Sequence, residues 1–396
     1  IVLRYDDIIF IMKNKQSILR NGIRKRKQGG NNDMRSFIGQ GTGNAKNAVQ
    51  EATRGLESPE AIIFIAPYDI IGEVADLLKK QYPNTPSIGT IGTKLVNGQV
   101  GDNNISVLGL FSDAKVRCGV IENISECPVV SIGKLEKDIS AVSPGHGDTV
   151  CLEYCTGEEE KLVTTFTSCF EKKGIQLAGG TAFGAPEGKA SVVAYNGKIY
   201  GNACVYALIK NTTGKVRVYK ENIYKKQASN ISHFATKVDT SKKALVELDG
   251  KPAAEVYSQE LGISKDKIID NVLKNPMGRA VGDEVFISSM MSMEPNGTLI
   301  NYKRINKNDC IYFLELGEYQ QIEQETRNKI QSDMNHISLV VSIDCIYRYL
   351  LYDGEGYFAT YAKDMASLGN HMGVVGGGEQ CNNQHVNQTM VCAVFE

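Results

Sequence analysis

The order of apolar and polar positions predicts a fixed series of elements in the first part of the chain. Residues 60–68 (EAIIFIAPY) form a short apolar run of strand length, and residues 69–82 carry apolar side chains at the spacing of an amphipathic helix. A Gly-rich strand end, SIGTIGT at residues 87–93, comes next. Residues 103–112 and 114–124 then have strand patterns. The predicted order is strand, helix, Gly-ended strand and further strands.

The same order returns in the next part of the chain. Residues 148–174 predict a strand followed by a helix, and residues 175–184 (IQLAGGTAFG) form another Gly-rich strand end. Residues 189–209 predict a hairpin with Asn-Gly at positions 196–197, which is the strongest short hairpin signal. We interpret this repetition as an internal duplication within residues 34–230.

The pattern occurs a third time near the end of the chain. Residues 338–345 are an apolar strand, helical segments lead up to residue 369, and residues 376–395 begin with three glycines and end as an apolar strand. Before them, residues 247–262 predict a helix and residues 283–305 a hairpin. The expected fold class is therefore α/β (α+β). Duplicated strand-helix-strand-strand units would form layered sheets covered by helices, with a C-terminal α/β domain of similar construction.

Composition and charge exclude several classes of protein. Hydrophobic residues make up 42% and charged residues 22% of the 396 residues, which are globular values. The formal net charge of −1 gives no general reason to expect nucleic acid or an anionic membrane as a partner. No run approaches the ~18 apolar residues that a membrane span needs. We expect a soluble cytoplasmic protein whose ten cysteines are reduced thiols, mostly in the core.

A basic stretch precedes the repeated pattern. Residues 13–28 (KNKQSILRNGIRKRKQ) contain many Lys and Arg residues and no acidic residue. Since no aromatic residue is interleaved with the charge, a solvated tail is favoured over a nucleic-acid or membrane contact. We therefore expect a disordered basic tail at residues 1–33, an N-terminal domain at residues 34–230 and a C-terminal domain at residues 231–396.

The Gly-rich strand ends have one physical property in common. Without side chains, their backbone can approach another backbone or a small ligand closely. Two explanations of the glycines remain open: close packing between sheets, or contact with a small ligand. The functional interpretation is that equivalent turns line one pocket, formed by Gly179, Gly180, Thr181, Gly377 and Gly378.

Polar residues concentrate directly after the last glycines. Strand alternation predicts that His385, Asn387 and Thr389 lie on one face, with Glu379 and Gln380 across the presumed turn. Buried polar groups need partners, so these side chains could hold an amino or carboxylate group of a metabolite. They could also form a satisfied polar network that fixes the hairpin. No metal site is expected, because the cysteines lack a metal-ligand spacing.

A catalytic interpretation requires a nucleophile close to a base. The candidates are Cys381 or Thr181 as nucleophile with His385 as base, which would make the protein a hydrolase. The chain contains no Walker loop, no G-x-S-x-G elbow and no H-E-x-x-H motif. We expect a binding protein without enzymatic activity, and a pocket is favoured over a catalytic site.

Five stretches resemble the FIST family, in which an N-terminal FIST domain is followed by a FIST C-terminal domain. They occur in the order of the family over residues 34–396, and the basic stretch lies outside the resemblance. The stretches are PSIGTIGT (86–93), GIQLAGGTAFG (174–184), ALVELDGKPAAEVYSQELG (244–262), NPMGRAVGDEVFI (275–287), and GGGEQ followed by HVNQTMVCAVF (376–395).

The resemblance implies an intracellular sensory module of bacterial signal transduction, including chemotaxis. Small ligands, amino acids in particular, have been proposed for the family, and the partner would be a downstream signalling protein or a fused output domain. Some members bind haem and sense nitric oxide, which would need a proximal ligand such as His385 or His371. Otherwise no cofactor is implied. A protein-interaction scaffold without a ligand is the remaining alternative.

Overall fold

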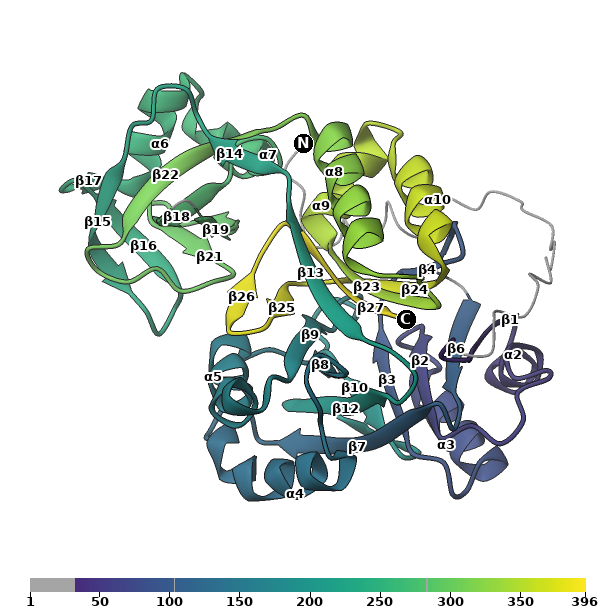
Figure 1. The fold of residues 1–396 in the computed structure, drawn as a ribbon. Helices are drawn as coiled ribbons and strands as arrows, with labels where there is room; N and C mark the ends of the chain where they lie inside the picture. The colour runs from purple at the N-terminus through teal and green to yellow at the C-terminus, as the bar shows by residue number, and fades with distance from the viewer. Residues whose placement is uncertain (1–32, 103, 283) are drawn as a thin grey trace.

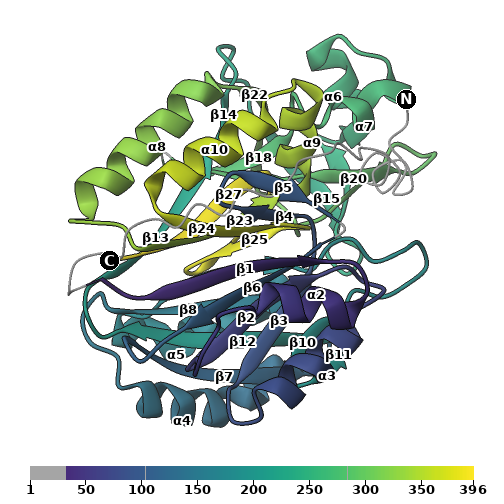
Figure 2. The same cartoon turned by 90° about the vertical axis from the view of Figure 1, so that its right-hand side faces the viewer.

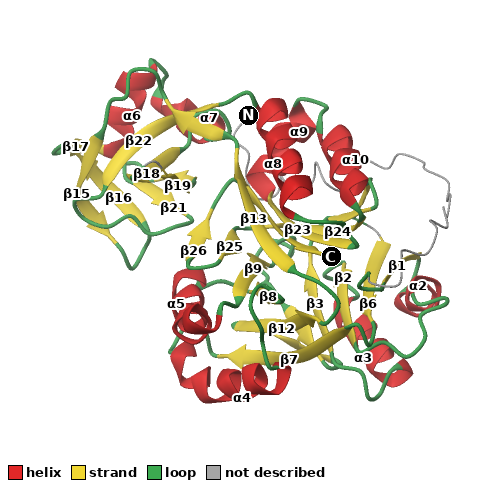
Figure 3. Cartoon of the chain, in the orientation of Figure 1, coloured by secondary structure: helices red, strands yellow, loops and turns green. Residues whose placement is uncertain are grey.

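The computed structural model describes residues 33–102, 104–282 and 284–396. The basic stretch, and with it nearly all of the tail expected at residues 1–33, lies outside the described residues. The described strands form three six-stranded sheets and one nine-stranded sheet, with helices on the outer faces of the sheets (Figure 1, Figure 3). This mixed architecture confirms the expected fold class.

The three six-stranded sheets are built from three units with the same order of elements. Each unit runs outer strand, helix, strand, helix region, strand, hairpin and final strand. The sequence pattern predicts these repeats because each apolar strand is followed by an amphipathic helix with the same spacing of apolar residues. The repetition extends to the C-terminus and is not limited to the first half of the chain.

The first unit covers residues 36–110. In its second helix the buried residues recur at helical spacing, which places one face of the helix on the sheet. Its elements are β1 (Ser36–Thr42), α2 (Ala45–Ala52), β2 (Ala61–Ala66), α3 (Ile71–Gln81), β3 (Ser87–Ile91), β4 (Lys94–Val96), β5 (Gln99–Gly101) and β6 (Asn104–Leu110).

The second unit covers residues 114–211. Its second helix region ends at Gly174, which has a φ of +62° and so takes the left-handed conformation that closes many helices. Its elements are β7 (Ala114–Glu122), α4 (Ile132–Val142), β8 (Thr149–Cys155), α5 (Glu159–Phe170), β9 (Gln176–Thr181), β10 (Val193–Tyr195), β11 (Lys198–Tyr200) and β12 (Ala203–Asn211).

The third unit begins with β13 (Val216–Asn222) and resumes at residue 319 after a long insertion. Its helices α8 and α10 cover the outer face of its sheet, whereas α2, α3 and α4 lie on the opposite side of the molecule (Figure 2). Its other elements are α8 (Tyr319–Asp333), β23 (Leu339–Cys345), α9 (Ile346–Gly354), α10 (Phe358–Leu368), β24 (Asn370–Gly376), β25 (Glu379–Cys381), β26 (Gln384–Val386) and β27 (Thr389–Phe395).

Each unit gives its hairpin to the sheet of another unit. The strand orders are β1-β6-β2-β3-β10-β11, β7-β12-β8-β9-β25-β26 and β13-β27-β23-β24-β4-β5. The first unit thus supplies the β4–β5 hairpin to the third sheet, the second unit supplies β10–β11 to the first sheet, and the third unit supplies β25–β26 to the second sheet. The exchange is cyclic and ties the three units together.

The exchanged hairpins are held by the same contact three times. Each turn begins with an asparagine whose φ lies between +46° and +52°, a conformation that Asn tolerates better than most residues. The Asn side-chain oxygen accepts a hydrogen bond from a backbone N–H at the start of the strand with which the hairpin pairs. The pairs are Asn97 with His371 at 2.9 Å, Asn196 with Ser87 at 2.9 Å and Asn382 with Leu177 at 3.1 Å.

The insertion after β13 forms a separate lobe around the nine-stranded sheet (Figure 1). Its helix at Ala253–Leu261 is shorter than the segment predicted from the sequence, and Pro252 stands at its N-cap. The lobe elements are β14 (Tyr224–Lys226), β15 (His233–Asp239), β16 (Ala244–Leu248), β17 (Lys251–Pro252), α6 (Ala253–Leu261), α7 (Ile268–Asn271), β18 (Met277–Val281), β19 (Glu284–Ser288), β20 (Met290–Met293), β21 (Leu299–Asn301) and β22 (Cys310–Leu316).

The domain boundary expected at residue 230 stays a prediction. In the structure, two of the six-stranded sheets combine strands from both sides of that residue.

All ten cysteines are free thiols, and eight of them are buried. Over the described part of the chain, none of the helices has the length and apolar character needed to cross a membrane.

Candidate functional site

The three Gly-rich strand ends meet in space, and each comes from a different unit. Thr181, at the end of β9, donates its backbone N–H to the carbonyl of Gly378 at 2.9 Å and accepts a hydrogen bond from the N–H of Gly377 at 2.8 Å. The N–H of Val375, in β24, donates to the carbonyl of Thr93, just after β3, at 2.9 Å. The ends of β3 and β9 therefore each form backbone hydrogen bonds with the end of β24 or with the residues directly after it.

Gly179 and Gly180 provide space for neighbouring protein side chains. A Cβ atom on Gly179 would lie 2.1 Å from Oε1 of Glu153, and one on Gly180 would lie 2.4 Å from Cγ2 of Ile343. The absence of a side chain at these two positions is therefore explained by packing within the protein. Both glycines are buried beside the site.

The hairpin of β25 and β26 has two different faces. Gln380 pairs with His385 across the hairpin, so both side chains lie on one face, and Glu379 with its partner Val386 lies on the other. Asn387 follows β26, and its Nδ2 lies 3.4 Å from Nε2 of His385. Gln380, His385 and Asn387 therefore form one polar surface.

Thr389 lies on the opposite face, which corrects the alternation expected from the sequence. Gln388 has a φ of +55°, and this left-handed residue interrupts the strand between β26 and β27. Oε2 of Glu379 accepts hydrogen bonds from the N–H and the hydroxyl of Thr389 at 3.2 and 2.7 Å. Glu379 is fully buried, and burial raises its pKa to about 8. Glu379 and Thr389 thus form an internal pair behind the hairpin.

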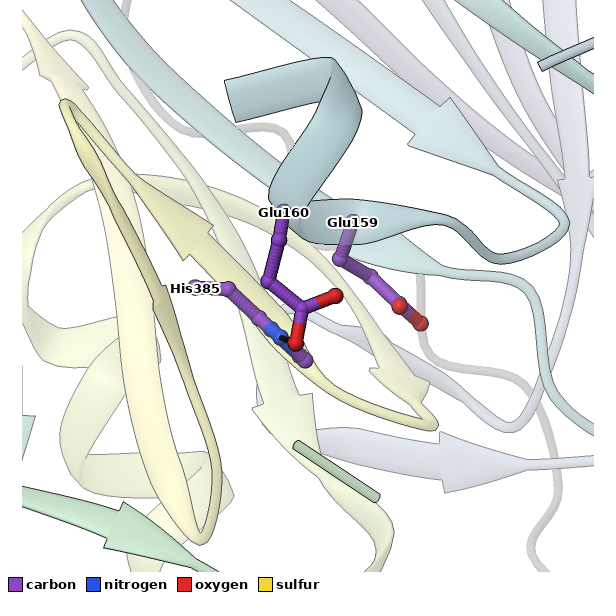
Figure 4. A group of neighbouring side chains, drawn as sticks. All are labelled: Glu159, Glu160 and His385. Carbon is purple, nitrogen blue, oxygen red and sulfur yellow. Dashed lines mark ion pairs between the residues drawn. The ribbon is translucent and has the colours of Figure 1, made fainter. Parts of the chain in front are cut away.

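The start of α5 brings two glutamates to the polar face of the hairpin. In Figure 4 the carboxylate of Glu160 lies beside the ring of His385, and the distance between Glu160 Oε1 and His385 Nδ1 is 3.8 Å. Glu159 Oε1 accepts a hydrogen bond from the hydroxyl of Thr181 at 2.9 Å. The side-chain amide of Gln380 donates to the same hydroxyl at 3.4 Å. We call Thr181, Glu159, Glu160, Gln380 and His385 the polar cluster.

The lobe contributes cations to the polar cluster. Lys243 Nζ lies 3.4 Å from Glu159 Oε2 and also donates to a backbone carbonyl of the lobe. The backbone N–H of Arg304 donates to Glu160 Oε1 at 3.1 Å, and its guanidinium lies 3.9 Å from Glu160 Oε2. Lys303 Nζ donates to the carbonyl of His385. The cluster therefore lies where the second unit, the hairpin of the third unit and the lobe come together.

The charges around the cluster set the ionisation of its carboxylates. Burial alone would raise the pKa values of Glu159 and Glu160, but His385 and Lys243 outweigh it, and both pKa values lie below the ordinary 4.5. Burial, together with nearby cations, lowers the pKa of Lys303 to about 8. At neutral pH both glutamates are ionised, so the site contains acidic and basic groups side by side.

Three buried atoms of the cluster have no hydrogen-bond partner among the described residues. They are Oε1 of Gln380, Nδ1 of His385 and Oε2 of Glu160. Two of these atoms have a charged neighbour beyond hydrogen-bond distance: Glu160 Oε2 lies 3.9 Å from the Arg304 guanidinium, and His385 Nδ1 lies 3.8 Å from Glu160 Oε1. A water or a small polar molecule that reaches these atoms would complete their hydrogen bonds.

The surroundings of the two candidate histidines do not fit a haem ligand. His371 is fully buried, its Nε2 lies 2.9 Å from the hydroxyl of Ser342, and burial lowers its pKa to about 4. His385 is enclosed by Glu160 and Asn387.

The nucleophile and base expected for a hydrolase are not paired. Cys381 lies on the same strand face as Glu379, on the other side of the hairpin from His385. Burial raises the pKa of the Cys381 thiol to about 11, which leaves little thiolate at neutral pH. The hydroxyl of Thr181 donates to Glu159 and not to His385. Neither candidate nucleophile therefore has a hydrogen bond with His385 among the described residues.

Sequence reasoning missed the residues that complete the cluster. Glu159 and Glu160 belong to an acidic run at the start of a helix, where acidic residues are favourable for the helix alone. Lys243 and Arg304 lie in the lobe and carry no local motif. No signal within one segment connects these residues with His385, because the contact is made only by the tertiary structure.

Comparisons with known proteins identify the sequence family. The sequence model of the FIST N domain matches residues 61–251, and that of the FIST C domain matches residues 253–382. Among curated proteins, no significant match was found.

Some solved structures align over most of the chain at low similarity. A cyanuric acid hydrolase is 8% identical, with 92% of this chain and 100% of that chain covered and a TM-score of 0.35. A chorismatase is 8% identical, with 92% and 99% covered and a TM-score of 0.36. At these TM-scores the likeness carries no argument about the site.

Proposed function

The chain belongs to the FIST family, whose domains are sensory domains of signal transduction, and from this we propose that it binds a small polar metabolite in the polar cluster. In this proposal the polar cluster binds the metabolite and does not convert it chemically. Binding would be reported to a downstream signalling protein or to a fused output domain.

The observation that carries this proposal is the set of unsatisfied buried atoms in the cluster. Gln380 is fully buried and His385 is 4% exposed, yet each has a polar atom without a hydrogen-bond partner among the described residues. Leaving such an atom unpaired costs about 1–3 kcal/mol. A ligand that pairs with these atoms recovers that free energy on binding.

The charges of the cluster favour a ligand that carries both an amino and a carboxylate group. Glu159 and Glu160 provide two carboxylates, and Lys243 and Arg304 provide cations beside them. A zwitterion such as an amino acid can interact with both signs of charge, whereas an uncharged ligand would leave the existing ion pairs unchanged. An amino acid or a related small metabolite is therefore the proposed ligand class.

The position of the cluster suggests how binding could be signalled. The lobe joins the core through residues 222–224 and 317–319, and the N–H of Gly317 donates to the carbonyl of Ile223 at 2.8 Å, so the two connections lie side by side. A ligand held by core residues and by Lys243 would favour one arrangement of lobe and core over others. That difference in population is what a partner would recognise.

The proposal is tested by thermal-shift measurements on the purified chain with amino acids and related metabolites. A ligand present at ~100 times its Kd should raise the unfolding free energy by about 2.7 kcal/mol. Gln380→Ala should abolish the shift. Gln384→Ala is the matched control, because this residue lies in the same hairpin and contacts Lys220 outside the cluster. No shift with any compound, or an equal shift in Gln380→Ala, would contradict the proposal.

A further inference from the structure

Three side chains of the polar cluster have the arrangement of an incomplete metal site. Glu159, Glu160 and His385 each offer one ligand atom, and these atoms lie within 4.8 Å of one another (Figure 4). Ligand atoms around a zinc ion, with bonds of about 2.0–2.3 Å, lie roughly 3–4 Å apart. Side-chain adjustments of about 1 Å would bring the three atoms to that geometry.

The unsatisfied atoms of the cluster are of the kind that bind a cation. Oε2 of Glu160 and Oε1 of Gln380 are acceptors, and neither has a hydrogen-bond partner among the described residues. The side chain of His385 is 2% exposed, and its Nδ1, also without a hydrogen-bond partner, faces Glu160. A cation with an oxygen- and nitrogen-rich coordination shell would pair with the atoms of Glu160 and His385.

A second residue positions the imidazole. The carboxamide of Asn387 lies 3.4 Å from Nε2 of His385. The amide nitrogen faces the ring, because Oδ1 of Asn387 accepts a hydrogen bond from the N–H of Ser289 at 3.4 Å and Nδ2 donates to the carbonyl of Val386 at 3.1 Å. Asn387 thus holds the ring with Nδ1 toward Glu160, and a metal at Nδ1 would release the proton of that nitrogen.

Lys243 competes with a metal for the same carboxylate. Its Nζ lies 3.4 Å from Glu159 Oε2 and donates at 2.7 Å to the carbonyl of Tyr302. A metal at the cluster would displace the ammonium group from Glu159, while the carbonyl would still hold it nearby. The lysine therefore lowers metal affinity, and it becomes available to a negatively charged group of a second ligand.

We propose that Glu159, Glu160 and His385 bind a divalent transition-metal ion such as Zn²⁺. Three protein ligands leave at least one coordination position open. A metabolite with amino and carboxylate groups can occupy open positions through its nitrogen and oxygen atoms. The inference rests on the proposed function in that the metal and the metabolite occupy the same site.

The test is a Zn²⁺ titration of the full, chelator-treated chain, in which binding is measured by calorimetry or by competition with a chromogenic chelator. One Zn²⁺ should bind per chain, and His385→Ala and the isosteric Glu160→Gln should each weaken binding at least about tenfold. Lys243→Met should tighten binding by roughly 3–10-fold, because it removes a cation next to Glu159. His146→Ala is the control, since it removes an exposed histidine elsewhere. Mg²⁺ should bind much more weakly, because it prefers oxygen ligands and water.

The absence of Zn²⁺ binding to the wild-type chain would overturn the metal proposal. So would Zn²⁺ binding that persists at full affinity in both His385→Ala and Glu160→Gln, or that is weakened by Lys243→Met. Thermal midpoints of the metal-free variants establish that each is folded. Repeating the metabolite screen in EDTA separates the two proposals. A metabolite shift that remains in EDTA without Zn²⁺ binding supports the sensory proposal and rejects the metal, whereas Zn²⁺ binding without any metabolite shift does the reverse.

Discussion

Replacing Glu379 by Gln should change the dependence of stability on pH. Glu379 is fully buried behind the β25–β26 hairpin. One carboxyl oxygen accepts two hydrogen bonds from Thr389, and the other has no hydrogen-bond partner among the described residues. Burial outweighs the hydrogen bonds from Thr389 and raises the pKa from 4.5 to about 8. The folded protein therefore holds this side chain in its neutral form at pH 7.

The direction and size of the effect follow from linkage. A carboxyl group with a raised pKa in the folded state contributes stability that is fully present below pH 4.5 and is lost as the pH rises through about 8. At about 1.4 kcal/mol per pH unit, this amounts to roughly 5 kcal/mol of unfolding free energy. Gln has nearly the same shape and does not titrate, so the variant should keep the contribution that the wild type loses.

The assay is urea unfolding of wild type and Glu379→Gln at a series of pH values from 5 to 9.5. The two proteins should be within about 1 kcal/mol of each other at pH 5, since the neutral acid and the amide make similar contacts. Above pH 9 the variant should be more stable by several kcal/mol. Glu126→Gln, at an exposed position, controls for the general effect of removing a carboxylate. A difference that does not vary with pH would refute the reasoning, because it would mean that Glu379 is not buried in its neutral form.

Three further substitutions test the packing and the hairpin exchange by urea unfolding. Gly179→Ala should lower the free energy of unfolding by about 1–3 kcal/mol or more, because the new Cβ would lie 2.1 Å from Glu153 Oε1. Replacing Glu153 by Ala in the same chain should recover part of the loss. An unchanged urea midpoint for Gly179→Ala would show that the strand has room for a side chain. Asn382→Ala should lower the free energy of unfolding by about 1–2 kcal/mol, because the side chain no longer accepts the hydrogen bond from Leu177 and Ala is strained at a φ of +52°. Asn382→Gly loses the same hydrogen bond but tolerates this φ, so its loss should be smaller. Equal losses in the two variants would show that the positive φ does not matter. Arg348→Met should lower the free energy of unfolding by about 3–5 kcal/mol, because it leaves the buried carboxylates of Glu221 and Glu323 without their cation. An unchanged free energy of unfolding would show that other groups hold these carboxylates.

The sequence predicted the repeated units because their signals are local. The buried strand at Ala61–Ala66 and the helix at Ile71–Gln81 follow from apolar spacing alone. The hairpin at Asn196 follows from turn chemistry, because Asn and Gly tolerate the positive φ values that a two-residue turn requires. His385 and Asn387 were identified, together with Thr389, as polar residues at alternate positions before an apolar strand, and Gln380 was identified because it lies across the presumed turn.

The same reasoning was wrong about Thr389, because one residue changed the alternation. A strand period of two places side chains at alternate positions on one face only while every residue is extended. The positive φ of Gln388 ends that regularity between β26 and β27. Gln carries no strong preference for this conformation, so no local signal reveals the interruption.

By itself the sequence determined which segments form strands, helices and turns, because these depend on the periodicity of side chains and on the backbone preferences of Asn and Gly. The tertiary structure alone decided which sheet receives each hairpin, since all three turns have the same local chemistry and differ only in the strand that they meet. It also decided the content of the site. Glu159 and Glu160 reach His385, and Lys243 reaches Glu159, only because the hairpin exchange and the inserted lobe bring distant segments together. Contacts between such segments depend on packing over the whole chain, and no local pattern encodes them.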